Sequence, residues 1–436
     1  MNPSIWKVVV FSQGLSLEQA PPISVVLRFF LSVPVFGIFF SLLLIIYPLE
    51  ILTPNHPISL SAIHLFFLGV ISMSMIGSLF QMQSVLGGRP IPSVLGNSLV
   101  IHTFFTAGLA SLVSAFFFHI PAMFVIAAVL LGSSLVFLVQ LILPLLFGGV
   151  VHDTLRGMRL ALISLLITAL FGVVMAVSFA NETFGNLHAA IRTAHYSWGL
   201  IGWVAALIIA VAFQVIEMFY VTTPYGAWCK RNAFRILALS LILKTSWLFL
   251  ALPYLWVFDL FVAVLLIGFV ITTILRLRER KRRVGDVSIW FWTMGMGLLL
   301  ISLISYSAYL WNWSASLETV AIISFGLFSL AIILGMMTKI VPFLVWFHLS
   351  SSGYLETPIM STIIPAKRNK TLFALFTISS LFALVSVFKL LLLPVAGVGF
   401  FLLFALLGYN LIRAVRLYTH IQKTGTRFVM NANSIA

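Results

Sequence analysis

Charged residues and cysteines are both scarce in this sequence. Of its 436 residues only 8% are Asp, Glu, Lys or Arg, whereas 61% are hydrophobic and the mean hydropathy is +1.15. Ordinary soluble domains carry about 25% charged residues, so the composition excludes a soluble globular protein and indicates a polytopic membrane protein. The single cysteine, Cys229, excludes a disulfide framework and a thiolate metal cluster.

Several sequence signals are missing as well. Segment 1–23 lacks an apolar core long enough for a cleaved signal peptide, so we interpret it as a retained cytoplasmic segment. No Gly-rich phosphate loop, HExxH motif or EF-hand occurs in a credible context, so ATP-driven transport by this chain alone is not expected. The formal charge of +15 is interpreted through its position relative to the membrane and not as a signal for nucleic acid.

Apolar runs of about twenty residues predict transmembrane helices, because the backbone must satisfy its own hydrogen bonds in the bilayer core. About twelve are predicted, at 24–49, 59–84, 94–118, 121–149, 157–180, 195–221, 233–252, 254–276, 287–310, 317–346, 371–390 and 393–417. Very short links at 119–121 and 252–253 predict tight hairpins. We therefore expect an all-α fold, with one transmembrane domain over 24–418 and a cytoplasmic tail over 419–436.

The basic residues of the predicted links sort to one side of the membrane. Alternate numbering of the links places only Arg192 on the opposite side, so the positive-inside rule predicts that both termini are cytoplasmic. The densest basic run is RLRERKRR at 276–283. We interpret it first as a topology anchor and second as a surface for anionic lipid head groups or a partner.

The second, sixth and tenth predicted helices share one pattern. Setting Gly69 on Gly202 also sets Gln81 on Gln214, 133 residues later, and a further step sets Gln81 on Lys339. Each step corresponds to four helices. The chain is therefore predicted to contain three four-helix units, at about 24–149, 157–276 and 287–418, in a pseudo-threefold arrangement with the repeated helices facing inward.

Histidines near the outer ends of two repeated helices are the candidate cofactor ligands. His64 lies about one turn inside the second predicted helix, and His195 lies at the start of the sixth. Two facing neutral imidazoles would bind a heme b in six-coordinate, electron-transferring form. The alternatives are a copper or zinc site, or histidines that only hydrogen-bond at helix ends; further histidines near this face that could help a metal site are His188, His119 and His56.

Small residues follow His195 at helical spacing. Gly199 and Gly202 stand at i+4 and i+7, so one face below the histidine is nearly flat. Such residues allow close helix packing, and they equally leave a slot for a flat macrocycle. Both interpretations stay open from the sequence.

Polar residues gather at the inner ends of the repeated helices. They are Gln81, Gln83, Gln214, Glu217 and Lys339. An ionisable residue inside a membrane span is costly unless it is paired, hydrated or neutralised. Glu217 and Lys339 are predicted to pair, either as a structural lock or at the mouth of a path for protons or a polar solute.

Taken together, these features resemble subunit I of the heme-copper oxidases and the related NnrS family. The resemblance rests on twelve helices, cytoplasmic termini, the threefold repeat and a histidine near the outer end of the second helix. It implies that His64 is an axial ligand of a low-spin heme and that His195 takes the position of a copper ligand. No Trp-His-x-His run, found in NnrS proteins, occurs in the second helix; the copy here is Ser-Ala-Ile-His.

The departures from the oxidase pattern limit the expected activity. The seventh predicted helix has no His-His pair, and the outer end of the tenth has no His-x-His. We therefore expect a bacterial inner-membrane protein that binds heme, or less readily copper, in electron transfer, nitrosative-stress response or cofactor handling, and not a complete terminal oxidase. The alternatives are a secondary transporter without a metal cofactor, and an interaction or assembly subunit of a respiratory complex with a redox partner.

Overall fold

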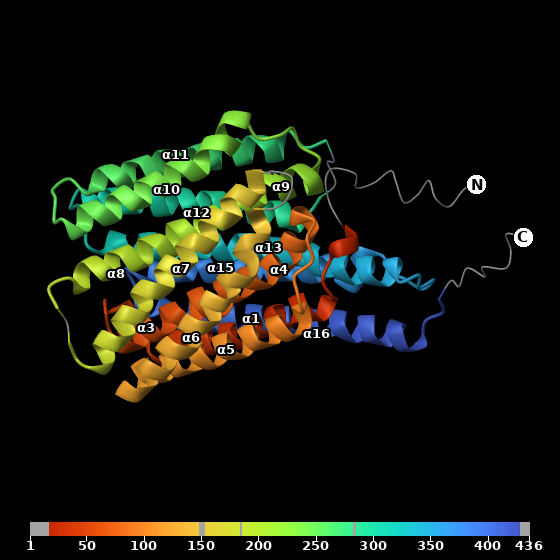
Figure 1. Ribbon diagram of the computed structural model, residues 1–436, viewed down its shortest axis with the longest axis horizontal. Coiled ribbons are helices and arrows are strands. Elements are labelled where there is room, and N and C mark those ends of the chain that lie inside the picture. Colours follow the sequence, from red (N-terminus) through yellow and green to blue (C-terminus); the bar gives the residue numbers. More distant parts are fainter. Residues whose placement is uncertain (1–16, 148–152, 184, 282–284, 428–436) are drawn as a thin grey trace, which may run out of the picture. The chain divides into compact units, whose positions relative to one another are not determined.

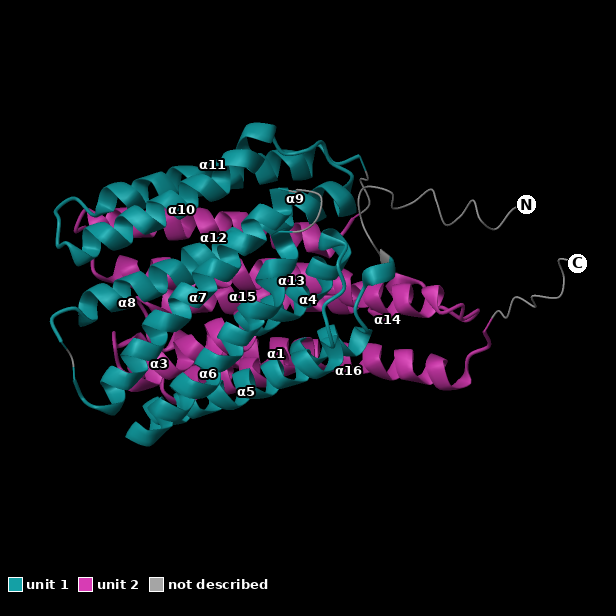
Figure 2. Cartoon of the chain, in the orientation of Figure 1, with its two compact units in different colours: residues 1–29, 72–283 teal, residues 30–71, 284–436 magenta. Residues whose placement is uncertain are grey.

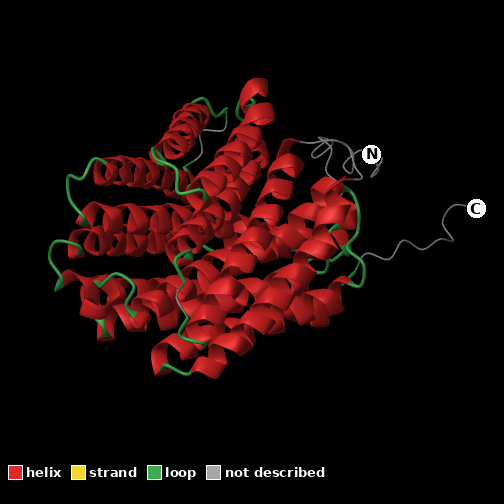
Figure 3. Cartoon of the chain, turned by 60° about the vertical axis from the view of Figure 1, so that its left-hand side comes forward, coloured by secondary structure: helices red, strands yellow, loops and turns green. Residues whose placement is uncertain are grey.

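Helices account for all regular secondary structure in the described part of the chain (Figures 1 and 3). The computed structural model describes residues 17–147, 153–183, 185–281 and 285–427. Within these ranges the only β-type pairing is one isolated bridge, between Tyr354 and Arg427. Twelve helices in these described ranges are long and apolar enough to cross a membrane, which matches the number of spans predicted from the sequence.

The second and sixth spans are each built from three consecutive helical pieces. The second joins α3 (Pro57–His64), the π-helix η2 (Leu65–Ser72) and α4 (Met73–Gly87). The sixth joins α8 (His188–Ser197), the π-helix η4 (Trp198–Ala205) and α9 (Ala206–Tyr220).

The other ten spans are, in chain order, α1 (Ile23–Ile46), α5 (Val94–Phe118), α6 with the 3₁₀ turn η3 (Pro121–Ile142 and Leu143–Phe147), α7 (Asp153–Ala180), α10 (Ala227–Phe249), α11 (Trp256–Arg278), α12 (Val287–Leu310), α13 (Ser316–Ser351), α15 (Ala366–Ser386) and α16 (Leu392–Thr424). Three short pieces lie outside the spans: η1 (Leu17–Gln19) before α1, α2 (Pro48–Leu52) between the first two spans, and α14 (Met360–Ile363) between α13 and α15.

Local chemistry explains several helix boundaries. Proline occupies the first turn of α3 and α6, where its missing N–H is not needed. The carboxylate of Asp286 caps α12 by accepting from the Ser288 amide at 2.9 Å. His119 ends α5 with a left-handed φ of 56°, which turns the chain directly into α6 and confirms the predicted hairpin. The second predicted hairpin is a short link, 250–255, between α10 and α11.

The helix bounds correct two details of the sequence interpretation. Span six begins at His188 and not at 195, because the polar stretch HAAIRTA continues the helix beyond the apolar window that predicted it. Helix α15 ends at Ser386, so Lys389 falls in the turn before α16, on the side where only Arg192 was expected to be basic. The charge asymmetry is therefore weaker than the sequence alone indicated.

The register of the repeat is visible in the secondary structure of spans two and six. An offset of 133 residues carries η2 onto η4 and α4 onto α9 at both ends of each element. It also carries Gly88 onto Val221, and both adopt left-handed φ, 62° and 51°. The π-helices are thus a shared feature of two repeated spans, whereas α13 in span ten is a continuous α-helix.

Burial separates the repeated spans from the others. In the most apolar 18-residue stretch, 72%, 72% and 89% of the residues are buried in spans two, six and ten, against 28–56% in the remaining nine. These three are therefore the most buried of the twelve spans, while the three-unit arrangement stays a prediction. Of the polar residues singled out from the sequence, Gln81 and Gln83 in span two are buried, whereas Gln214, Glu217 and Lys339 are half-buried.

The chain forms two compact units, drawn in different colours in Figure 2. Unit 1 comprises residues 1–29 and 72–283, and it contains helices α4 to α11. Unit 2 comprises residues 30–71 and 284–436, and it contains α3, most of η2 and helices α12 to α16. Within unit 1, α7 packs against α8, η4 and α9; within unit 2, α12 packs against α13, and α15 against α16.

Candidate functional site

His64 is the last residue of α3, directly before the π-helix of span two. Its Nδ1 lies 2.7 Å from the carbonyl oxygen of Leu60, one turn earlier in the same helix. A carbonyl oxygen can only accept, so Nδ1 carries the proton and the lone pair of the neutral ring is on Nε2. This arrangement fixes both the tautomer and the orientation of the imidazole.

His195 has the same kind of contact with a different partner. Its Nδ1 lies 2.9 Å from the carbonyl oxygen of Thr168 on α7. The ring fits closely against Gly172, where an added Cβ would come within 3.1 Å of the imidazole Cε1. The structure therefore places His195 two turns inside its helix and against α7, and not at the edge of the span as predicted.

The glycines that follow His195 serve close packing. A Cβ added at Gly199 would meet the Thr168 side chain at 3.2 Å, and one added at Gly202 would meet Ser164 Oγ at 2.4 Å. Helix α7 therefore occupies the side that these glycines open. Of the two interpretations left open by the sequence, helix packing is confirmed and a macrocycle slot at these glycines is wrong.

Spans two and six meet at their π-helices within unit 1. The indole Nε1 of Trp203 in η4 donates to the hydroxyl of Ser72, the last residue of η2, at 3.0 Å, and both side chains are buried. Ser72 follows His64 by eight residues, and Trp203 follows His195 by eight residues. His64 and His195 are therefore each eight residues before the side chain that makes this contact.

A second hydrogen bond holds η4 from another side. Trp198, the first residue of η4, donates from Nε1 to Thr245 Oγ1 on α10 at 2.8 Å. Trp198 also packs with Ala194 and Leu241 in a small buried cluster. Helix α8 and η4 are therefore packed between α7 and α10, and this packing holds the His195 imidazole in place.

The histidines that were candidate helpers of a metal site have structural positions. His56 caps α3, with its Nδ1 accepting from the Ile58 amide at 3.3 Å. His119 ends α5, and His188 is the first residue of α8, edge-on to the ring of Phe179. Over the residues that the structure describes, no group of three or more His, Cys, Asp or Glu side chains is placed to hold a metal ion.

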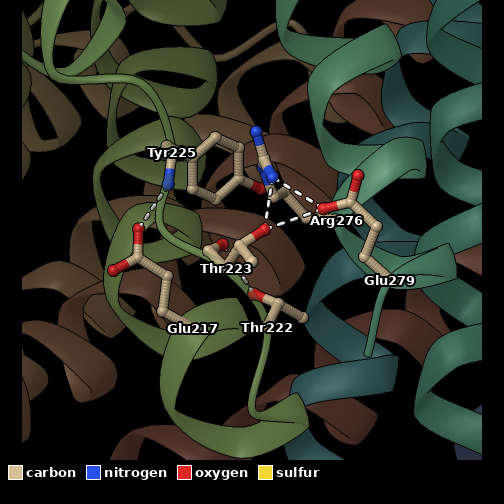
Figure 4. A network of polar contacts seen from close by, with 6 residues as sticks. All are labelled: Glu217, Thr222, Thr223, Tyr225, Arg276 and Glu279. Carbon is tan, nitrogen blue, oxygen red and sulfur yellow. Dashed lines mark hydrogen bonds and ion pairs between the residues drawn. The ribbon is translucent and has the colours of Figure 1, made fainter. Parts of the chain in front are cut away.

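Glu217 organises the C-terminal end of span six (Figure 4). Its carboxylate pairs with Lys230 at 2.6 Å. It also accepts from the backbone amide of Tyr225 at 2.9 Å, the contact drawn in Figure 4. Lys230 and Tyr225 both follow in the chain, so Glu217 ties the loop 221–226 and the start of α10 to α9. The predicted pair with Lys339 stays a prediction.

The loop after α9 is joined to α11 by a polar network. The buried Tyr225 hydroxyl lies 3.0 Å from Thr273 Oγ1, and burial raises the pKa of this phenol above its ordinary value. Arg276 donates to both Thr223 and Glu279, and Thr223 donates to Glu279 at 2.7 Å (Figure 4). These bonds fix the C-terminal end of α11 beside the loop that leads into α10.

Lys339 in span ten pairs with Asp286 at the start of α12, inside unit 2. Burial alone would raise the pKa of Asp286, but the Lys339 ammonium and the Ser288 hydroxyl and amide lower it below its ordinary value. Asp286 was not predicted from the sequence as the partner of Lys339. The sequence did indicate that Asp286 is important, because it lies directly before the apolar run of α12, where an N-cap residue is expected.

A further ion pair was not predicted from the sequence at all. Lys244 on α10 and Asp259 on α11 are 2.5 Å apart, and their side chains are only 9% and 17% exposed. Both lie inside predicted spans. The sequence did contain a signal for this pair, because Lys244 and Asp259 lie at similar distances on either side of one short hairpin and carry opposite charges.

The glutamine amides predicted to line a polar path differ in burial: two are buried and one is partly exposed. The buried Gln83 has no hydrogen-bond partner for either amide atom in the described structure, and Gln81 has none for its Oε1. Gln214 is partly exposed. Buried amides of this kind are uncommon, because each unpartnered atom is costly.

Comparison with known proteins adds no identification. No model of a known protein family matches this chain, and no curated protein matches it either. What the described structure defines is an all-helical protein with twelve candidate membrane spans.

Proposed function

We propose that this protein is a multi-pass membrane protein that binds a b-type heme, with His64 and His195 as axial ligands. The observation that carries the proposal is shared by the two histidines: each donates from Nδ1 to a backbone carbonyl, of Leu60 and of Thr168. Metal-binding histidines are commonly oriented in this way, because the bond fixes the tautomer and raises the basicity of Nε2.

The donor set suits heme better than a bare metal ion. Two neutral imidazoles satisfy the two axial positions of a heme iron, whereas a copper or zinc site needs further ligands, and no group of three ligand residues occurs among the described ones. A bis-histidine heme b supplies one-electron transfer when it is bound. The chain's own contribution is to hold each imidazole rigidly, through α3 for His64 and through α7 for His195.

The expected absence of terminal oxidase activity follows from the ligands that are missing. Helix α10 contains no histidine, and the histidine of α13 is His348, near its C-terminal end. We propose electron transfer, nitrosative-stress response or cofactor handling in a bacterial inner membrane, with cytoplasmic termini and a redox or respiratory partner. The 133-residue register of spans two and six supports the four-helix repeat and, with it, the proposed pseudo-threefold arrangement resembling oxidase subunit I.

Spectroscopy of the purified protein tests this proposal. After expression with ample heme, the wild type should give reduced-minus-oxidised bands of a low-spin heme b and a pyridine hemochrome signal. His64→Ala and His195→Ala should each lose the low-spin bands. His420→Ala, an exposed histidine at the end of α16, is the matched control and should keep them. A colourless wild type, or unchanged bands in both ligand variants, would refute the proposal.

A secondary transporter is the second candidate. It is favoured by the ion pairs Glu217–Lys230 and Lys339–Asp286 together with the unpartnered amide of Gln83, all of which lie towards the C-terminal ends of the buried spans or next to them. If the protein binds no heme, uptake of polar solutes into proteoliposomes by wild type and by Lys339→Met is the next measurement. Equal uptake by both, at the level of empty liposomes, would argue against transport.

A further inference from the structure

One end of unit 1 carries an excess of positive charge that its own acids do not neutralise. Here Glu217 pairs with Lys230, and Glu279 pairs with Arg276. Four further basic side chains of α10, α11 and the residues after α11 are exposed and have no acidic partner among the described residues; they are Arg231, Arg235, Arg278 and Lys281, whereas Arg280 is half-buried and donates to the Leu277 carbonyl. We call these four residues, together with Trp228, the α10–α11 basic surface.

The polar network of Figure 4 holds the two halves of this surface together. Arg276 of α11 bonds to Thr223 in the loop that leads into α10, and the Lys281 amide donates to the Val221 carbonyl at 3.2 Å. The end of α11 and the start of α10 are therefore fixed side by side. The bases of both helices consequently gather at one place.

The start of α10 has an unfavourable charge pattern unless an anion is near. Gly226, the N-cap residue, provides no capping side chain, and the first turn contains Lys230 and no acid. The N-terminus of a helix carries partial positive charge, so basic residues there are destabilising in isolation. These features favour a bound anion.

Adjacent apolar side chains identify the kind of anion. On α11, Ile267, Ile271 and Leu275 are exposed and follow one another at i, i+4 and i+8, and this row ends beside Arg278. On α10, Trp228 is 68% exposed and shares a face with Arg231 and Arg235. An exposed tryptophan next to bases is typical of the membrane interface. A free phosphate would leave the apolar row unused, whereas acyl chains would cover it.

We propose that the α10–α11 basic surface binds the head group of an anionic phospholipid, whose acyl chains lie along the exposed apolar row of α11. The phosphate is bound by Arg231 and Arg278, with Lys281 beside them. This inference does not depend on the proposed heme. It assigns the basic run at 276–283 a binding role in addition to its role as a topology anchor.

The test measures lipid binding to the full-length protein. Protein in detergent is titrated with phosphatidylglycerol and, separately, with phosphatidylcholine, and bound lipid is counted by native mass spectrometry. The variant Arg231→Gln/Arg278→Gln is compared with Lys367→Gln/Lys370→Gln, which removes two exposed bases at the start of α15 in unit 2. Each base near an anionic surface contributes roughly fivefold to lipid affinity, so the first variant should lose about tenfold or more for phosphatidylglycerol and the control less than about threefold.

Three outcomes would overturn the proposal. Equal losses in both variants would mean a general attraction of all basic ends, and no loss in the first variant would mean that no lipid binds here. Displacement of phosphatidylglycerol by millimolar inorganic phosphate would indicate a free-anion site instead of a lipid site. Thermal unfolding of both variants in phosphatidylcholine nanodiscs serves as the folding check, and their midpoints should stay close to that of the wild type.

Discussion

The Lys244–Asp259 pair gives the sharpest prediction about stability. It joins α10 and α11 at 2.5 Å with both side chains largely shielded from solvent. Removing one partner of a buried pair leaves an uncompensated charge and typically costs about 3–5 kcal/mol, whereas replacing both partners by apolar residues is often close to neutral. We therefore expect Lys244→Met and Asp259→Leu each to cost about 3 kcal/mol or more, and the double variant to cost less than about 1 kcal/mol.

The measurement is the free energy of unfolding in mixed micelles at neutral pH, for the wild type, both single variants and the double variant. The exposed pair Asp153–Arg156, 2.9 Å apart with side chains 35% and 36% exposed, is the matched control. Surface pairs contribute about 0–1 kcal/mol, so its cycle should show little coupling. The reasoning is refuted if the costs of Lys244→Met and Asp259→Leu simply add in the double variant.

Three further predictions concern packing, a hydrogen bond and pH. Gly202→Ala should destabilise by about 1–3 kcal/mol because its Cβ would collide with α7, whereas Gly268→Ala, with open space around it, should be neutral or stabilise by up to about 1 kcal/mol; thermal unfolding compares the two. Trp203→Phe and Ser72→Ala should each cost about 1 kcal/mol, and a double-mutant cycle should show that these costs do not add. Asp286 has a lowered pKa in the folded state, so its contribution to stability is present above its ordinary pKa of about 4 and is lost as the pH falls through the folded value. Asp286→Asn should remove that part of the acid sensitivity, and an unchanged stability-pH profile below pH 5 would contradict this.

The apolar length of each segment was enough to predict the twelve spans. Bilayer thickness and backbone hydrogen bonding leave few alternatives to a helix of about twenty residues. The repeat register was equally accessible, because Gly69 and Gln81 recur at one spacing in span six. The π-helices at that register were not predicted, since an extra residue in a helical turn leaves no compositional signal.

The polar contacts were harder to predict, and the reasons differ from residue to residue. The ion pair of Glu217 with Lys230 on the next helix was not predicted, because the comparison of equivalent depths considered only the repeated spans. His195 was placed too near the membrane edge because hydropathy reports apolar length, while a helix also continues through polar residues. Lys244 and Asp259 were hidden inside segments that otherwise satisfied the criterion for a span.

The two π-helices have a geometric consequence. Each widens its turns by holding more residues than an α-helix of the same length, so whatever follows is rotated about the helix axis. If Leu65–Ser72 instead closed to an α-helix with no residue removed, the extra residue would turn the rest of span two by about 100° relative to His64. Gln81 and Gln83 would then exchange their present surroundings for those of a neighbouring position, while His64 would stay where it is. The π-helix therefore determines how far the half of the span that carries Gln81 and Gln83 is rotated about the helix axis relative to the half that carries His64.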